Sequence, residues 1–75
     1  MGNIAKVEME IKDRLCTAIK TCGLTLTQIA QAVGISVATV SYYKNKEKLP
    51  TVPTLAILCV VLDISADELL GLPKY

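Results

Sequence analysis

A single glycine between two short helical patterns most constrains how this chain can fold. Gly34 follows an apolar pattern at helical spacing and precedes a second pattern that begins after Ser36. Glycine adopts the left-handed backbone that ends a helix at little cost, so it favours a sharp corner here. The stretch Thr25–Asn45 therefore predicts two short helices joined by a tight turn.

Both short helices begin with a capping signal. Thr25 is followed three residues later by Gln28, so its hydroxyl can accept from one free backbone N–H while the amide reaches back to another. Ser36 is the expected cap of the second helix, which we place at residues 36–44. Ala30 is small enough for the two helices to approach closely while crossing at about 90–120°. These features are typical of a helix-turn-helix motif.

The two faces of the helix at 36–44 differ in chemistry. Val40 and Tyr43 are expected to face the core. The other face is small, polar or aromatic, and a projecting helix of this kind fits the major groove of B-DNA, which is about 12 Å wide. The expected base contacts are Val37, Ala38, Ser41, Tyr42 and Asn45. The expected phosphate contacts are Thr25, Thr27, Thr39, Lys44, Lys46 and Lys48.

Two of these assignments have alternatives. Tyr42 can touch a base, hydrogen-bond a phosphate, or simply pack against the linker that follows the helix. The three lysines can form a local positive patch on the DNA backbone or an ordinary solvated loop. If a dimer neutralised about six phosphates with them, the logarithm of affinity would fall with the logarithm of salt with a slope of roughly −5.

The run between Arg14 and Leu70 resembles the phage-repressor and Cro-like helix-turn-helix family, the XRE class. The positions that carry the resemblance are Thr25, Ile29, Ala30, Val33, Gly34, Ile35, Ser36, Thr39, Val40, Ser41 and Pro50. The resemblance implies an all-α, five-helix lambda-repressor-like fold. It also implies a sequence-specific DNA-binding regulator, usually dimeric.

Three departures from the family pattern bear on the contacts. Leu26 stands where the family often has a Gln that touches phosphate, so that contact is lost. Ile19 and Lys44 replace an Arg–Glu pair that the family commonly forms between its first and third helices, which leaves Lys44 free to face phosphate. Lys46 stands where glycine is usual, so we expect Asn45 to take the left-handed backbone and turn away from the bases.

Three further helices are expected around the motif. The first spans about residues 3–22 and ends at Gly23. Residues 1–10 precede the part that resembles the family and form an extension or an early start to this helix, and Met1 is expected to fray. The next spans residues 52–62 after a Thr51 cap with Pro53 in its first turn, and a short last helix follows a capping box at Ser65. The core stripe of the first helix is Ile4, Val7, Ile11, Leu15, Ala18, Ile19 and Cys22.

The helix at 52–62 is apolar on every side, which is unusual for a helix at the surface of a small protein. Its core stripe is Leu55, Leu58, Cys59 and Leu62. This leaves Ile57, Val60 and Val61 to be covered, either by the N-terminal extension or by a second copy in a symmetric dimer. We favour the dimer.

Composition limits the other possibilities. The chain has 75 residues and a net charge of +1, so we expect one domain over residues 1–75. With three cysteines and no histidine, we expect no metal, no cofactor and reduced thiols. A redox-sensing role for the cysteines is a remote alternative. Catalysis is not expected, because neither a His base nor a glycine-rich phosphate loop is present. With neither a signal peptide nor a membrane-length apolar run, the expected location is the cytoplasm, in a bacterial or phage-encoded setting.

Together these features predict a DNA-binding transcriptional regulator, a repressor rather than an activator. Its expected partner is a double-stranded operator with inverted half-sites about 34 Å apart, bound by a homodimer. The competing hypothesis is a protein-interaction module of the antitoxin or anti-repressor kind, which would use the apolar surface of the helix at 52–62.

Overall fold

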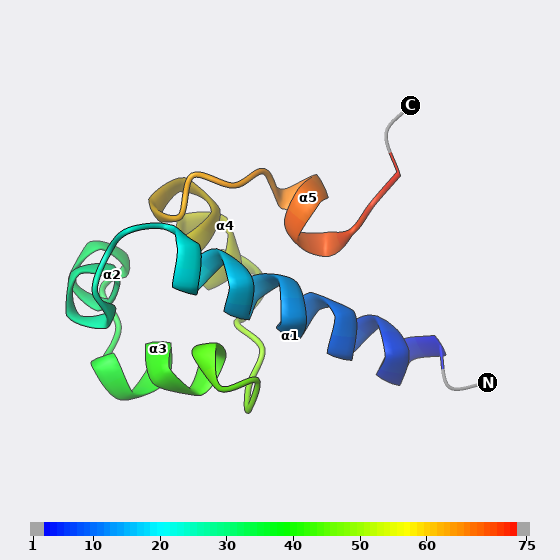
Figure 1. Ribbon diagram of the computed structural model, residues 1–75, viewed down its shortest axis with the longest axis horizontal. Helices are drawn as coiled ribbons and strands as arrows, with labels where there is room; N and C mark the ends of the chain where they lie inside the picture. Colours follow the sequence, from blue (N-terminus) through cyan, green and yellow to red (C-terminus); the bar gives the residue numbers. More distant parts are fainter. Residues whose placement is uncertain (1–2, 74–75) are drawn as a thin grey trace.

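A computed structural model describes residues 3–73 of the chain. This part folds into five helices and contains no strand. The helices are α1 (Asn3–Thr21), α2 (Leu26–Val33), α3 (Val37–Lys44), α4 (Val52–Val61) and α5 (Ala66–Leu70). α1 runs through the middle of the molecule, with α3 on one side and α4 and α5 on the other (Figure 1). Met1, where we expected fraying, lies outside the described residues.

The core is aliphatic and draws on all five helices. Each helix contributes one side chain with no exposed surface, and these are Leu15, Ile29, Val40, Leu58 and Leu69. Fully burying such a side chain is worth about 1.5–3 kcal/mol relative to leaving it exposed. The inward positions predicted for α3 and α4 are therefore confirmed, and the core fixes the position of α3.

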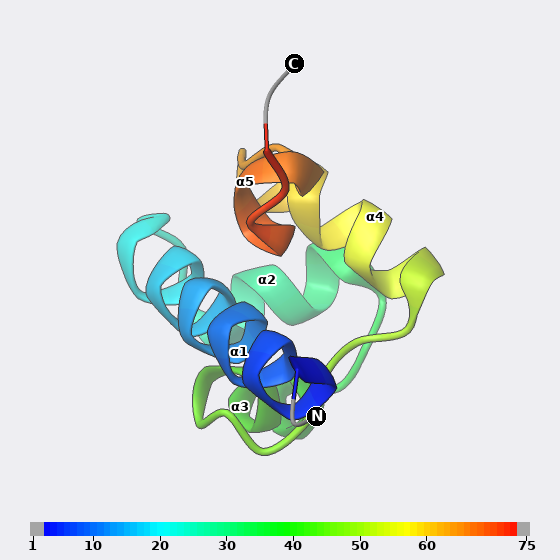
Figure 2. The ribbon, with the colours of Figure 1, turned by 90° about the vertical axis from the view of Figure 1, so that its right-hand side faces the viewer.

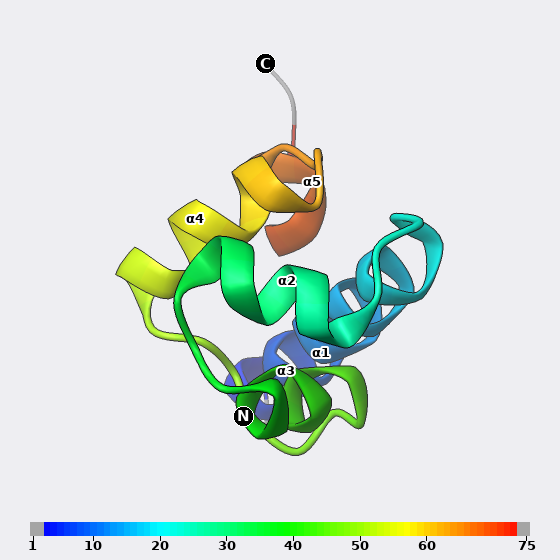
Figure 3. The same ribbon diagram turned by 90° about the vertical axis from the view of Figure 1, so that its left-hand side faces the viewer.

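The corner between α2 and α3 forms as the sequence predicts. The Gln28 N–H donates to Thr25 Oγ1 at 3.1 Å, and the Thr25 N–H donates to Gln28 Oε1 at 2.9 Å, so the capping box is complete. Gly34 takes the left-handed conformation, with φ 87° and ψ 32°. Figure 1 views α2 almost end-on while α3 lies in the plane of view, and Figure 3 shows α2 passing above α3. The two axes therefore cross steeply.

The expected core stripe is wrong for the first turns of α1. Ile4 is 78% exposed and Val7 is 48% exposed, whereas Leu15 and Ile19 are buried. The N-terminal turns extend past the rest of the molecule (Figure 1). Helical spacing identifies one apolar face, but burial also needs another element opposite that face.

Two predicted caps are only partly right. Thr51 is the N-cap of α4, but its side chain accepts no backbone N–H, and its hydroxyl donates to the Thr54 hydroxyl at 3.1 Å instead. Ser65 caps α5 by accepting from the Glu68 N–H at 3.1 Å. This bond from the Glu68 N–H to the Ser65 hydroxyl is one of the two hydrogen bonds of the predicted capping box. α5 is followed by Gly71 in the left-handed conformation.

Candidate nucleic-acid interface

α3 presents two different faces. Val40 and Tyr43 point into the core, and burial raises the pKa of the Tyr43 phenol above its ordinary value. On the opposite face, Val37 is 42% exposed and Tyr42 is 39% exposed. Figures 1 and 3 show α3 at one end of the molecule, away from α4 and α5. This outer face of α3 is therefore open to solvent.

The other predicted base contacts lie on the same outer face. Ala38 and Asn45 are exposed and Ser41 is half-buried. The Asn45 Nδ2 donates to Ser41 Oγ at 3.4 Å, a long hydrogen bond that places the two polar groups side by side. The outer face thus combines two small apolar side chains, an adjoining amide and hydroxyl, and one phenol.

The end of α3 differs from the prediction. Asn45 has φ −89°, whereas Lys46 has φ 64° and takes the left-handed position itself. The Lys46 N–H donates to the Tyr43 carbonyl at 3.2 Å, and the Glu47 N–H donates to the Tyr42 carbonyl at 2.9 Å. This pair of bonds is the Schellman motif, which needs a left-handed residue one position beyond the cap. Asn45 therefore stays in line with α3 and keeps its amide beside Ser41.

The three lysines after α3 have different surroundings. The Lys46 Nζ lies 2.8 Å from Asp13 Oδ1, which joins α1 to the end of α3 and raises the pKa of the Lys46 ammonium through a hydrogen bond and the opposite charge. The Lys48 Nζ lies 4.7 Å from the centre of the Tyr42 ring, a cation–π contact. Lys44 is half-buried on α3 itself.

Sequence reasoning missed the pairing of Asp13 with Lys46, although it left open that Tyr42 packs against the linker. Asp13 and Lys46 are far apart in the chain, and only the packing of α1 against α3 brings them together. The Lys48 contact shows that Tyr42 does touch the linker while its ring remains partly exposed. Ile19 is buried and Lys44 is half-buried, so the Arg–Glu pair of the family has no counterpart at these two positions. The ion pair between α1 and the end of α3 is instead formed by Asp13 and Lys46.

The threonines predicted to touch phosphate lie at helix starts. Thr25 caps α2 and Thr27 is exposed in its first turn. The Thr25 oxygen accepts a hydrogen bond within the capping box, so its O–H remains able to donate. Thr39 is half-buried, and its hydroxyl is 2.8 Å from the Ser36 hydroxyl at the start of α3. Thr25 and Thr27 are thus more exposed than Thr39.

The outer face of α4 is apolar and uncovered. Val60 is 81% exposed, Ile57 is 45% exposed, and α4 carries no charged residue between Val52 and Val61. The N-terminal extension therefore does not fold over this face in the described part of the chain. Val61 is half-buried and packs on the core, so the free part of the predicted dimer surface is formed by Ile57 and Val60.

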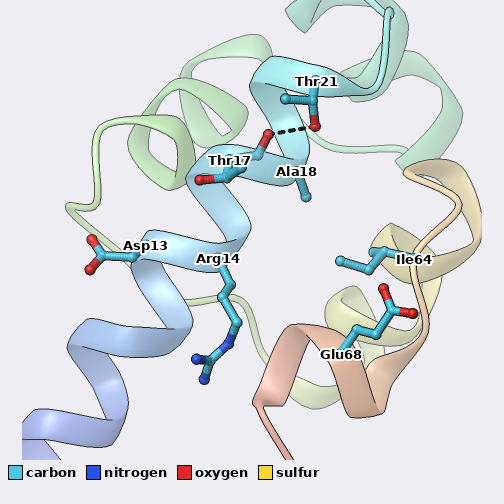
Figure 4. Close-up of a pocket in the computed structure, with 7 residues that line it drawn as sticks. All are labelled: Asp13, Arg14, Thr17, Ala18, Thr21, Ile64 and Glu68. Atoms are coloured by element: carbon cyan, nitrogen blue, oxygen red, sulfur yellow. Dashed lines mark hydrogen bonds between the residues drawn. The ribbon is translucent and has the colours of Figure 1, made fainter.

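A separate groove of about 340 Å³ lies between α1 and the start of α5 (Figure 4). Ile64 and Glu68 point into it, whereas Asp13 points away (Figure 4). The Arg14 Nε donates to the Leu69 carbonyl at 2.8 Å, and the guanidinium lies against Gly71. Arg14 thus ties α1 to the end of α5, where a cation is favourable. This groove is a feature of the α1–α5 contact and is not part of the α3 face.

Other observations concern the described residues only. Within residues 3–73, no group of His, Cys, Asp and Glu side chains is arranged to bind a metal ion. None of the five helices combines the length and apolar character needed to cross a bilayer. All three cysteines are unpaired, and burial raises the pKa of the Cys59 thiol.

Five helices, a capped helix pair with a glycine corner and an uncovered second helix define a helix-turn-helix domain of the lambda-repressor-like kind. The helix-turn-helix family profile matches residues 17–69, so the chain belongs to this family of DNA-binding proteins, as the resemblance to its phage-repressor and Cro-like class implied. The predicted all-α fold is confirmed.

Two curated proteins are similar in sequence. The chain is 40% identical over 63 residues to the cryptic phage CTXphi transcriptional repressor RstR of Vibrio cholerae, an alignment covering 84% of this chain and 56% of the relative. It is 36% identical over 59 residues to the uncharacterized HTH-type transcriptional regulator YobD of Bacillus subtilis, covering 79% and 53%. The chain therefore spans about half the length of these relatives. No solved structure matches it significantly.

Proposed function

We propose that this chain is a sequence-specific transcriptional repressor that reads the major groove with α3. The observation that carries the proposal is the uncovered outer face of α3, where Val37 and Tyr42 are exposed beside the Asn45 amide. Family membership supports DNA binding, and one relative is named a transcriptional repressor. We propose that the chain is not an enzyme.

Each side chain on the outer face has a role in the proposal. Val37 and Ala38 offer apolar surface to thymine methyl groups, and Asn45 can pair with adenine N6 and N7. Ser41 bonds a base edge beside Asn45. Tyr42 is held against Lys48, so its hydroxyl meets the sugar-phosphate edge rather than a base. The half-sites are therefore expected to favour A·T pairs.

The backbone contacts surround this face. Thr25 and Thr27 lie at the start of α2, where free backbone N–H groups and the helix dipole favour an anion. Lys44 at the end of α3 and Lys48 in the linker approach the other phosphates, and Thr39 contributes through the start of α3. These contacts fix the register of α3 in the groove without reading sequence.

We further propose that residues 1–75 act as one domain and pair through α4. A twofold pairing of Ile57 and Val60 would bury side chains that are otherwise in water and would give the operator its inverted symmetry. The same uncovered face favours the second candidate function, a module that binds another protein through α4. The two functions are distinguished by whether duplex DNA binds at all.

The test is selection of bound sequences from a random duplex pool. The wild-type chain is expected to enrich an inverted repeat with half-sites about one helical turn apart. Ser41→Arg should lose or change the enriched sequence, whereas Ala66→Arg, which adds the same group at an exposed position on α5, should not. Enrichment of the same sequence by Ser41→Arg would reject α3 as the reader, and no enrichment by the wild type would reject DNA reading altogether.

A further inference from the structure

We infer that Asp13 withholds Lys46 from the DNA backbone, so that each chain offers two lysines to phosphate rather than three. The inference rests on the proposed function and refines it. Asp13 lies on α1, outside the helix-turn-helix, and in this inference it determines the affinity for DNA and how that affinity depends on salt.

The first support is the contact itself. The Asp13 Oδ1 and Lys46 Nζ atoms are 2.8 Å apart, within the range of charge-assisted hydrogen bonds. Asp13 points away from the groove between α1 and α5 and lies beside the loop that follows α3 (Figure 4). The carboxylate therefore stands at the DNA-facing end of the molecule.

The second support is that the backbone of both partners is held in place. Lys46 is held at φ 64° by the two hydrogen bonds of the Schellman motif, which fixes the direction in which its side chain leaves the backbone. Asp13 lies on α1, which packs against α3, and Leu15 of α1 and Val40 of α3 both belong to the buried core. The fold thus fixes the two backbone positions from which the pair forms, while the side chains themselves are 52% and 58% exposed.

The consequence follows from what a phosphate contact would require. Lys46 would have to leave Asp13, so one ion pair would replace another, and an unpaired carboxylate would remain close to the polyanion. Such an exchange yields no net neutralisation. By contrast, Lys44 lies on α3 and Lys48 rests on an uncharged ring, so both keep their charge available.

This count can be measured through salt. A dimer using three lysines per chain neutralises six phosphates and has a slope of about −5.4, whereas two per chain give about −3.6. Asp13→Asn keeps the shape of the side chain and removes its charge, so the slope should steepen by about 1.8. The ratio of the variant's affinity to that of the wild type should then rise about tenfold between 200 mM and 50 mM salt.

The experiment measures the affinity of the full chain for one selected duplex over a range of salt, with Asp13→Asn and four further variants. Glu8→Gln makes the same charge change at an exposed position on the same helix and should leave the slope unchanged. Lys46→Met should not steepen the slope, because it releases no lysine, and Lys44→Met should flatten it by about 1.8. Asp13→Asn combined with Lys46→Met should match the wild type, because both charges of the pair are then removed together.

Two results would overturn the inference. One is a flatter slope for Lys46→Met together with no change for Asp13→Asn, because Lys46 would then already contact phosphate in the wild type. The other is an equal steepening by Glu8→Gln and Asp13→Asn, which would reveal a general charge effect. A wild-type chain that binds no duplex would instead reject the proposed function, so the two failures are distinguishable.

Discussion

The corner at Gly34 yields a prediction whose magnitude follows from the backbone. Gly34 has φ 87°, and a Cβ added there would meet no other atom within 4 Å. Gly34→Ala therefore causes no clash, and its cost is that of holding an L-residue in the left-handed region, about 1–2 kcal/mol. For a domain of this size, that loss lowers the melting temperature by about 4–16 °C.

The assay is thermal and urea unfolding followed by far-UV circular dichroism. Gly34→Asn should cost less than Gly34→Ala, because asparagine tolerates the left-handed region, and Gly34→Val should cost more, because its side chain is β-branched. Gly34→Val is also the variant expected to misplace α3. The order Asn, Ala, Val is a signature of backbone strain.

Gly23 provides a matched control. It has φ 81°, it also has nothing within 4 Å of an added Cβ, and it lies before the helix-turn-helix. Gly23→Ala should lower stability as much as Gly34→Ala while leaving the affinity for duplex DNA unchanged below the melting temperature. A loss smaller than about 0.5 kcal/mol in Gly34→Ala, the range of ordinary surface substitutions, would refute the role given to the left-handed corner.

Three other predictions concern the core, the dimer and pH. Leu58→Ala should lower the free energy of unfolding by about 2–5 kcal/mol in urea titration, because Leu58 is fully buried. Val60→Lys should keep the fold but weaken self-association in sedimentation equilibrium, and an unchanged mass would exclude pairing through α4. The contribution of the Tyr43 phenol to the free energy of unfolding should be fully present below the ordinary pKa of tyrosine. It should be lost as the pH rises through the raised pKa of Tyr43, since the unfolded chain loses its phenolic proton first. Tyr43→Phe should reduce that alkaline loss in unfolding measured against pH.

Local features were predictable from the sequence. The capping box at Thr25, the glycine corner and the inward position of Val40 each depend on residues within one or two turns of chain. Their chemistry is therefore visible in the spacing alone. The same is true of the core stripe of α4, where Leu58 and Leu62 are buried as expected.

Features that depend on distant parts of the chain were not predictable. The pairing of Asp13 with Lys46 needs the packing of α1 against α3, which no local pattern specifies. The exposure of Ile4 reflects how far α1 extends past its neighbours rather than any property of its own stripe. Figure 2 shows these turns in front of the domain, with α3 below and α4 and α5 above.

The left-handed backbone at Lys46 is a local feature that residue preference alone did not predict. Asparagine adopts this conformation more readily than lysine, so propensity alone favoured Asn45. The Schellman bonds to the Tyr42 and Tyr43 carbonyls require it one residue later. The geometry of the helix end therefore outweighs the preference of the residue.

The central claim is that α3 is the surface that meets DNA, and titration of the isotopically labelled chain with a selected duplex tests it most directly. The account predicts saturable changes in the amide signals of residues 36–45 and at the start of α2, with those of α4 changing little in a sample that is already dimeric. Changes centred on residues 52–61 with α3 unaffected, or no saturable change with any duplex, would contradict it.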